Sequence, residues 1–117
     1  MAYKNKVLPI PLSSIDSATF TGAYQLLSGA AGITNPAIIL HIANNSNVPV
    51  TISYDGTNDH DFLLADTDRQ LEFQTNALPQ HYEAVLAAGT KVYVKGAAGM
   101  GNSGSVYLSG WYQPVGA

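Results

Sequence analysis

The chain of 117 residues contains no cysteine, and its charged residues are few. Without cysteine it can form no disulfide, no cysteine-based zinc site and no thiol nucleophile, so packing, backbone pairing or oligomerisation must stabilise it. Only 11% of its residues are charged, against about 25% in typical soluble domains. Because a free monomer usually carries more charge, this scarcity favours a subunit covered by copies of itself or by partners. An ordinary neutral-surfaced β-protein is the alternative.

Basic residues and long apolar segments are scarce as well. Five Lys plus Arg and a net charge of −3 provide no basic face, so we expect no nucleic-acid partner. Apolar runs such as PAIIL (36–40) are far shorter than the roughly 20 residues that span a bilayer. The start, MAYKNKVLPIPLSS, lacks the apolar segment of a signal peptide. We therefore expect synthesis in the cell interior and no membrane partner.

What the chain does contain is a series of strand patterns, with almost no helical periodicity. VTISY (50–54), KVYVK (91–95) and SVYLSGWYQ (105–113) alternate cleanly, and AIILHIA (37–43) is apolar enough for a central strand buried on both faces. At most one short helical turn is expected, with ALPQHYEAVLAAG (77–89) as its candidate. The pattern predicts an all-β, single-domain antiparallel β-sandwich of about eight strands, with jelly-roll or immunoglobulin-like topology.

The first 12 residues differ from the rest. VLPIPL (7–12) has prolines at positions 9 and 11, and proline cannot donate a hydrogen bond to a sheet ladder. We therefore expect residues 1–12 to be an extended N-terminal arm or an edge strand, and residues 13–117 to be the sandwich domain. An arm could clamp a neighbouring subunit. Its contacts would come from the side chains of Tyr3, Lys4, Val7, Pro9, Ile10 and Pro11.

The densest cluster of polar groups lies in SYDGTNDHDF, residues 53–62. Four of its residues carry the hard oxygen atoms that calcium prefers: Asp55, Asn58, Asp59 and Asp61. Their spacing does not match an EF-hand loop, because Gly56 comes second rather than sixth. An Asp-Gly pair between two strand patterns instead predicts a hairpin tip whose Asx side chains cap loop amides. We expect no metal and no cofactor, with a looser calcium site as the alternative.

No pattern in the chain predicts catalysis. His41, His60 and His81 lack a zinc-type spacing, and His41 lies in an apolar strand, where a lone histidine is usually a hydrogen-bonded core residue. GMGNSG (99–104) joins two strand patterns rather than a strand and a helix, so it is not a nucleotide loop. A carboxylate pair that includes Glu72 stays open as a hydrolase site. We expect no catalytic residues and no enzyme.

Aromatic side chains offer a candidate surface. Tyr93, Tyr107 and Trp111 each lie on the strand face opposite to aliphatic neighbours. If the strands at 91–95 and 105–113 pair, the three rings form a patch on an outer sheet face. Such a patch would stack on sugar rings or dock a protein partner. The alternative is that the rings belong to a second packed face.

Three segments together carry a family resemblance. VPVTISYDGTNDHDFL, QLEFQTN and GTKVYVKGAAG…GSVYLSGWY resemble patterns in small β-sandwich virion structural proteins of tailed bacteriophages, over residues 37–113. The resemblance implies a non-enzymatic subunit of the virion, as a capsid decoration or cement protein in preference to a neck or tail component. It implies assembly with itself, as a trimer or larger, and contacts with the major capsid or neck and tail proteins. The alternative is a carbohydrate- or receptor-binding module that uses the surface aromatics.

Overall fold

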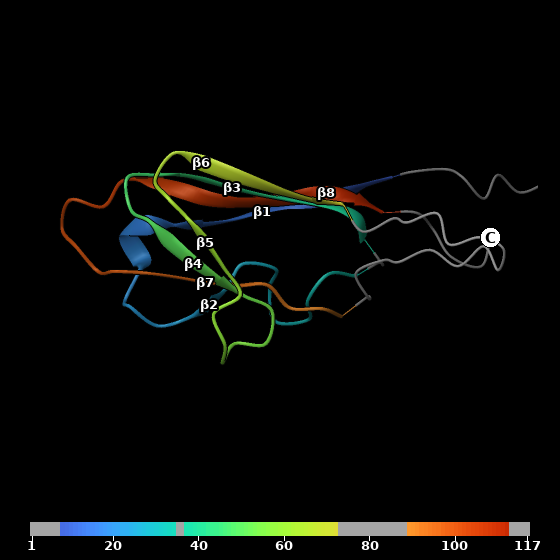
Figure 1. Cartoon of the computed structure of the whole chain (residues 1–117), viewed down its shortest axis with the longest axis horizontal. Helices are drawn as coiled ribbons and strands as arrows, with labels where there is room; N and C mark the ends of the chain where they lie inside the picture. The colour runs from blue at the N-terminus through green and yellow to red at the C-terminus, as the bar shows by residue number, and fades with distance from the viewer. Residues whose placement is uncertain (1–7, 35–36, 73–88, 113–117) are drawn as a thin grey trace, which may run out of the picture.

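The computed structural model describes residues 8–34, 37–72 and 89–112, whose regular structure is eight strands and one 3₁₀ turn (Figure 1). The strands are β1 (Leu8–Asp16), β2 (Gln25–Leu26), β3 (Ala37–Ser46), β4 (Val50–Ser53), β5 (Asp61–Leu63), β6 (Thr67–Glu72), β7 (Tyr93–Gly96) and β8 (Gly104–Tyr112), and the turn η1 spans Ser17–Thr19. No helix in these ranges is long and apolar enough to cross a membrane. The all-β prediction is confirmed.

The strands form two antiparallel four-stranded sheets. The long sheet has the order β1-β8-β3-β6, and the short sheet has the order β2-β7-β4-β5. Figure 1 shows the two sheets as stacked layers. Strands pair as β1 with β8, β2 with β7, β3 with β6 and β4 with β5, which is one long hairpin ribbon rolled up on itself. This order is an eight-stranded jelly roll rather than the immunoglobulin arrangement.

The core lies between the two sheets and is built from every second residue of the paired strands. Its buried side chains include Leu40, Ile42, Val106 and Leu108 from the long sheet and Val50, Ile52, Leu63 and Val94 from the short sheet. Burying one Val, Leu or Ile side chain stabilises a fold by about 1.5–3 kcal/mol. The alternate residues of these strands therefore face outward, where they form the two outer faces of the sandwich.

β3 differs from the prediction that it is buried on both faces. Leu40 and Ile42 are buried, whereas Ile39, His41 and Ala43 on the other face are only partly buried. Ile39 and Ala43 are apolar, and for this reason the sequence predicts that the outer face of β3 is buried as well. The prediction of His41 as a core residue is therefore wrong: its side chain is 34% exposed, and its Nε2 lies 2.8 Å from the Asp68 carboxylate on β6.

A buried amide connects the strands at one end of the sandwich. Asn44 is 1% exposed, and its Nδ2 donates to the carbonyl of Val48 at 2.9 Å and to that of Leu64 at 3.1 Å. Its Oδ1 accepts a hydrogen bond from the backbone N of Ser46 at 3.2 Å. These bonds join the β3–β4 connection to the β5–β6 connection. The Val48 carbonyl also accepts a hydrogen bond from Ser46 Oγ, so this buried polar cluster is internally paired.

Two predicted segments are described only in part. Residues 8–12 form the first half of β1, so the boundary predicted after residue 12 falls inside a strand at the edge of the long sheet. The register with β8 shifts between Ile10 and Ser13, an irregularity that accommodates Pro11 in this edge strand. Residues 1–7 lie outside the described residues, and so do residues 73–88, which contain nearly all of the candidate helix at 77–89.

Candidate interaction surfaces

The loop of residues 54–60 is the tip of the β4–β5 hairpin, as the sequence predicts. Asp55 organises it: Oδ1 accepts hydrogen bonds from the backbone N of Thr57 and of Asn58, both at 2.8 Å. The N–H groups of Asn58 and Thr57 hold the pKa of the Asp55 carboxyl below its ordinary value. Gly56 has a φ of +77°, a conformation that glycine adopts without strain. The predicted capping of loop amides by Asx side chains is confirmed.

The tip loop folds back onto the outer face of the short sheet. Asp59 accepts a hydrogen bond from the Tyr24 hydroxyl and lies 3.2 Å from Lys95 Nζ, and both contacts lower the pKa of Asp59. Lys95 Nζ also lies 4.5 Å from the centroid of the Tyr24 ring, which packs edge-on against Tyr93 at a centroid distance of 6.2 Å. A Cβ added to Gly56 would come within 2.9 Å of the Tyr93 ring. Tyr93 is therefore covered by the tip loop.

The four residues considered for calcium point to different partners. Asp55 and Asn58 bond within the loop, with Asn58 Nδ2 donating to Asp55 Oδ2 at 2.8 Å. Asp59 contacts the short sheet, and Asp61 Oδ1 lies 3.2 Å from Arg69 NH2 on β6. Over the part of the chain that the structure describes, no group of three His, Asp or Glu residues could hold a metal ion. The polar atoms of the cluster hold the loop in place.

The aromatic patch predicted from Tyr93, Tyr107 and Trp111 does not form, because its two strands lie in different sheets. β7 pairs with β2 and β4, and β8 pairs with β1 and β3. The prediction treated residues 91–113 as one hairpin, whereas residues 97–103 cross from one sheet to the other. Tyr93 thus lies on the outer face of the short sheet, and Tyr107 and Trp111 lie on the outer face of the long sheet.

The outer face of the long sheet carries two aromatic rings, Tyr107 and Trp111. Among the described residues no loop covers them, whereas the tip loop covers Tyr93. Trp111 is 46% exposed and Tyr107 is partly buried. They are four residues apart on β8, about 13 Å along the strand, with Ser109 between them on the same face. The register places Ala43 beside Tyr107 and His41 beside Ser109. Small side chains therefore separate the larger ones.

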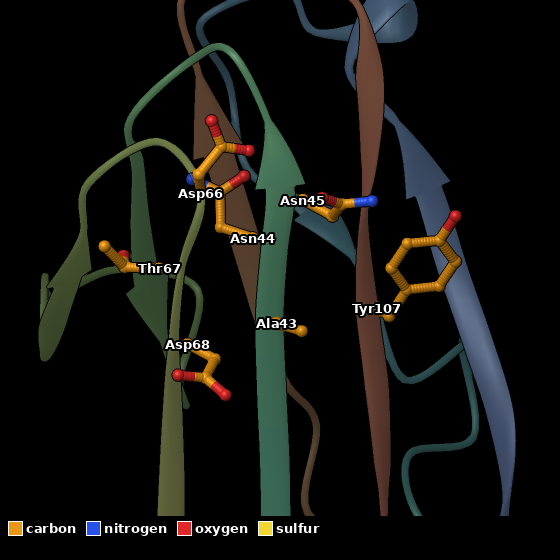
Figure 2. Close-up of a pocket in the computed structure, with 7 residues that line it drawn as sticks. All are labelled: Ala43, Asn44, Asn45, Asp66, Thr67, Asp68 and Tyr107. Carbon is orange, nitrogen blue, oxygen red and sulfur yellow. The ribbon is translucent and has the colours of Figure 1, made fainter.

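Two shallow hollows lie along this face. The first, of about 480 Å³, lies between Asp68 and Tyr107 and has Ala43 at its floor (Figure 2). The second, of about 290 Å³, lies over Ser109, between His41 and Trp111. Because His41 lines one hollow and its partner Asp68 lines the other, their hydrogen bond stands between the two hollows. Together the hollows present imidazole, carboxylate and hydroxyl groups beside aromatic rings.

The edge strand β1 borders a third depression. Of the residues predicted for an inter-subunit arm, Pro9, Ile10 and Pro11 lie in β1, and Tyr3, Lys4 and Val7 lie outside the described residues. A cleft of about 200 Å³ lies beside this strand. Most of its lining is apolar (Ile10, Pro11, Leu12, Ile33 and Leu108), and Ser13, Ser28 and Thr34 contribute hydroxyl groups. Leu12 is 66% exposed at its rim. The predicted arm thus contributes one wall of a cleft.

Sequence reasoning missed Tyr24, Lys95 and Asp68 as members of these surfaces. The outward position of Lys95 follows from its alternation with the buried Val94, so the period of two could have identified it. Asp68 lies in β6 two residues before the segment QLEFQTN, and its own neighbours in sequence show no strand pattern. Tyr24 lies in the chain just before β2, where no periodic pattern indicates which side chains meet.

Comparison of the chain with protein-family models, with curated proteins and with solved structures finds no match. The jelly roll occurs in viral capsid domains and in lectins, so the fold alone does not fix a function. The function is therefore inferred from the surfaces of this molecule.

Proposed function

We propose that the chain is a non-enzymatic structural protein of a tailed-bacteriophage virion that assembles with itself and stabilises the particle. Capsid decoration is favoured over a place in the neck or tail, because a compact domain with a proline-containing N-terminal strand suits attachment to a lattice of capsomers. The resemblance of residues 37–113 to such proteins supports the proposal, as does the charged fraction of 11%. The observation that carries it is a pair of apolar features on opposite edges of the sandwich.

One edge carries an exposed apolar knob, which we define as Phe62 and Leu64. Phe62 is 52% exposed and Leu64 is 61% exposed. Phe62 lies in β5, the edge strand of the short sheet, and Leu64 follows that strand directly. Natural proteins usually protect edge strands with charge or proline, because a bare apolar edge invites association. This edge is therefore suited to contact another protein surface.

The opposite edge carries the apolar cleft beside β1. β1 and β6 are the two edge strands of the long sheet, and β5 contacts β6. The edge that contains β5 is therefore opposite to the edge that contains β1. A knob on one edge and a cleft on the other form a head-to-tail contact between copies. Such a contact generates a closed ring when the rotation between subunits fits, in agreement with the expected trimer or larger assembly. A stable association buries about 1,600 Å² in total, so additional contacts must surround the knob.

Light scattering tests this mode of assembly. We expect the wild-type protein to be a trimer or larger, and we expect both a knob variant (Phe62→Ser with Leu64→Ser) and a cleft variant (Leu12→Asp) to be monomers. An equimolar mixture of the two variants should form dimers, because each pair retains one intact knob and one intact cleft. Met100→Ser is the control, since Met100 is fully exposed on the β7–β8 connection and should leave the mass unchanged.

Two outcomes would contradict the proposal. A wild-type protein that stays monomeric at high concentration, with and without added capsids, would rule out a self-assembling subunit. A large assembly that both variants leave intact would rule out the knob and the cleft. The place in the particle needs its own measurement: the chain should co-sediment with capsids of the phage that encodes it, and its absence from purified virions would contradict this location.

A further inference from the structure

The outer face of the long sheet has a composition that assembly through the two edges does not explain. From β8 it carries Tyr107, Ser109 and Trp111, and from β3 it carries His41 and Ala43. We call these five residues the aromatic trough. Large side chains stand at Tyr107, His41 and Trp111, and small side chains lie between them. The two hollows described above occupy the low positions.

The chemistry of the trough is amphipathic at the scale of a sugar ring. A pyranose presents an apolar C–H face that stacks on an aromatic ring and a rim of hydroxyl groups that need hydrogen-bond partners. Trp111 offers an exposed ring with the His41 imidazole in the same hollow, and the Asp68 carboxylate lines the neighbouring hollow. Because Tyr107 and Trp111 are four residues apart on β8, about 13 Å along the strand, an extended chain of sugars matches the trough better than a single sugar.

The charges on this face select among saccharides. Among the described residues the cationic side chains are Arg69, Lys91 and Lys95. Lys95 on the short sheet contacts Asp59, Arg69 contacts Asp61 on β5, and Lys91 lies two residues before β7. None of the three is on the trough, whereas Asp66 and Asp68 line its first hollow. An anionic glycan would meet like charge without compensation, so the face suits an uncharged one.

The same features argue against a second copy of the chain on this face. The centre of a protein–protein interface is apolar and closely packed. The trough is bordered by the His41–Asp68 pair, with Nε2 and Oδ2 2.8 Å apart and the Asp68 side chain exposed on the edge strand β6. Burying this pair under a protein would cost desolvation, whereas sugar hydroxyl groups can replace the water around it.

We propose that the aromatic trough binds an uncharged oligosaccharide chain, with Trp111 as the stacking platform. This site does not depend on the edge-to-edge assembly, and it lies on a different face. It assigns to the virion subunit a capacity to attach to neutral surface glycans. The position of Tyr93 under the tip loop excludes that ring from the site.

A glycan array followed by titration of the best ligand tests the site. We expect binding to neutral oligosaccharides and none to sulfated or uronic-acid glycans. Trp111→Ala should weaken binding by about tenfold or more, as expected for an aromatic anchor. Ala43→Gln fills the first hollow without altering Trp111 and should weaken binding too, which keeps the test valid if Trp111→Ala fails to fold. Met100→Ala is the control and should bind as the wild type does.

Three outcomes would overturn the inference. The first is the absence of binding to every neutral glycan on the array, and the second is binding restricted to anionic glycans. The third is binding that Trp111→Ala and Ala43→Gln both leave unchanged. The first outcome would follow if a second copy covered this face, and Trp111→Ala would then lower the mass measured by light scattering.

Discussion

The two outer faces of the sandwich use similar residues for different purposes. On the short sheet, the tip loop is held in place by two sets of contacts. Asp59 contacts Tyr24 and Lys95, and Gly56 lies against the Tyr93 ring. On the long sheet, Tyr107 and Trp111 lie near the hydrogen-bonded His41–Asp68 pair, and hollows rather than a described loop lie over the small residues between them. The comparison teaches that an aromatic residue facing outward from a strand is a binding candidate only when no loop returns over it.

The largest effect is expected where the tip loop meets the short sheet. Gly56→Val introduces a side chain at a φ of +77° and directs it at the Tyr93 ring. We expect the free energy of unfolding to fall by about 3 kcal/mol, since backbone strain and a steric clash combine. Gly29→Val is the matched control, because its φ is +83° and a Cβ there meets open space. Equal losses in urea unfolding for both variants would show that the loop does not rest on Tyr93.

Removing one ring from each face should separate their roles. Tyr93→Ala removes the support of the tip loop, and we expect a loss of about 2 kcal/mol in the free energy of unfolding. We expect about 1 kcal/mol or less for Trp111→Ala, whose ring is 46% exposed. Hydrogen exchange gives the sharper readout: the amides of Thr57 and Asn58 should exchange faster in Tyr93→Ala only. Equal acceleration in the two variants would contradict the difference between the faces.

Replacing Tyr54 should have a smaller effect, and it should stabilise the fold rather than destabilise it. Its hydroxyl is buried with no hydrogen-bond partner among the described residues, and burial raises the pKa of Tyr54 to about 12. Tyr54→Phe should therefore raise the free energy of unfolding by about 1 kcal/mol. Because the folded pKa lies above the ordinary value of about 10, the wild type should lose stability as the pH rises from 10 towards 12. The Phe variant should lack this loss, and thermal unfolding at alkaline pH would reveal it.

The smallest effect is expected on the stability of the tip loop at acidic pH, where Asp55 and Asp59 become protonated. Hydrogen bonds from loop amides lower the pKa of Asp55, and the Tyr24 hydroxyl and Lys95 lower that of Asp59. A carboxyl group whose pKa is lower in the folded state stabilises the fold at any pH above its unfolded pKa of about 3.9. This stabilisation is lost as the pH falls below about 3.9 and towards the lower pKa of the folded state. The melting temperature of Asp55→Asn should therefore be below that of the wild type at pH 6 and approach it near pH 3. A gap that does not narrow in acid would contradict the role of the ionised carboxylate.

The sequence predicted the local elements of this fold better than their arrangement. Alternation identified β4, β7 and β8, and the Asp-Gly pair identified the hairpin tip, because both depend on neighbouring residues only. The pairing of β8 with β1 and β3 is non-local, and assuming a β7–β8 hairpin placed Tyr93 beside Tyr107. The same difficulty applies to His41, whose partner Asp68 is 27 positions away in the chain. Outer faces are set by which strands become neighbours, so the aromatic trough could not be assembled from sequence.

Hydroxyl-radical footprinting at low and high protein concentration, read by mass spectrometry, tests most directly the claim that the two edges assemble while the long-sheet face stays open. We expect Phe62, Leu64 and Leu12 to become protected as the protein associates, while Trp111 and Tyr107 keep their reactivity and Tyr93 stays protected throughout. Protection of Trp111 and Tyr107 on association, with Phe62 and Leu12 unchanged, would contradict this division of the surface.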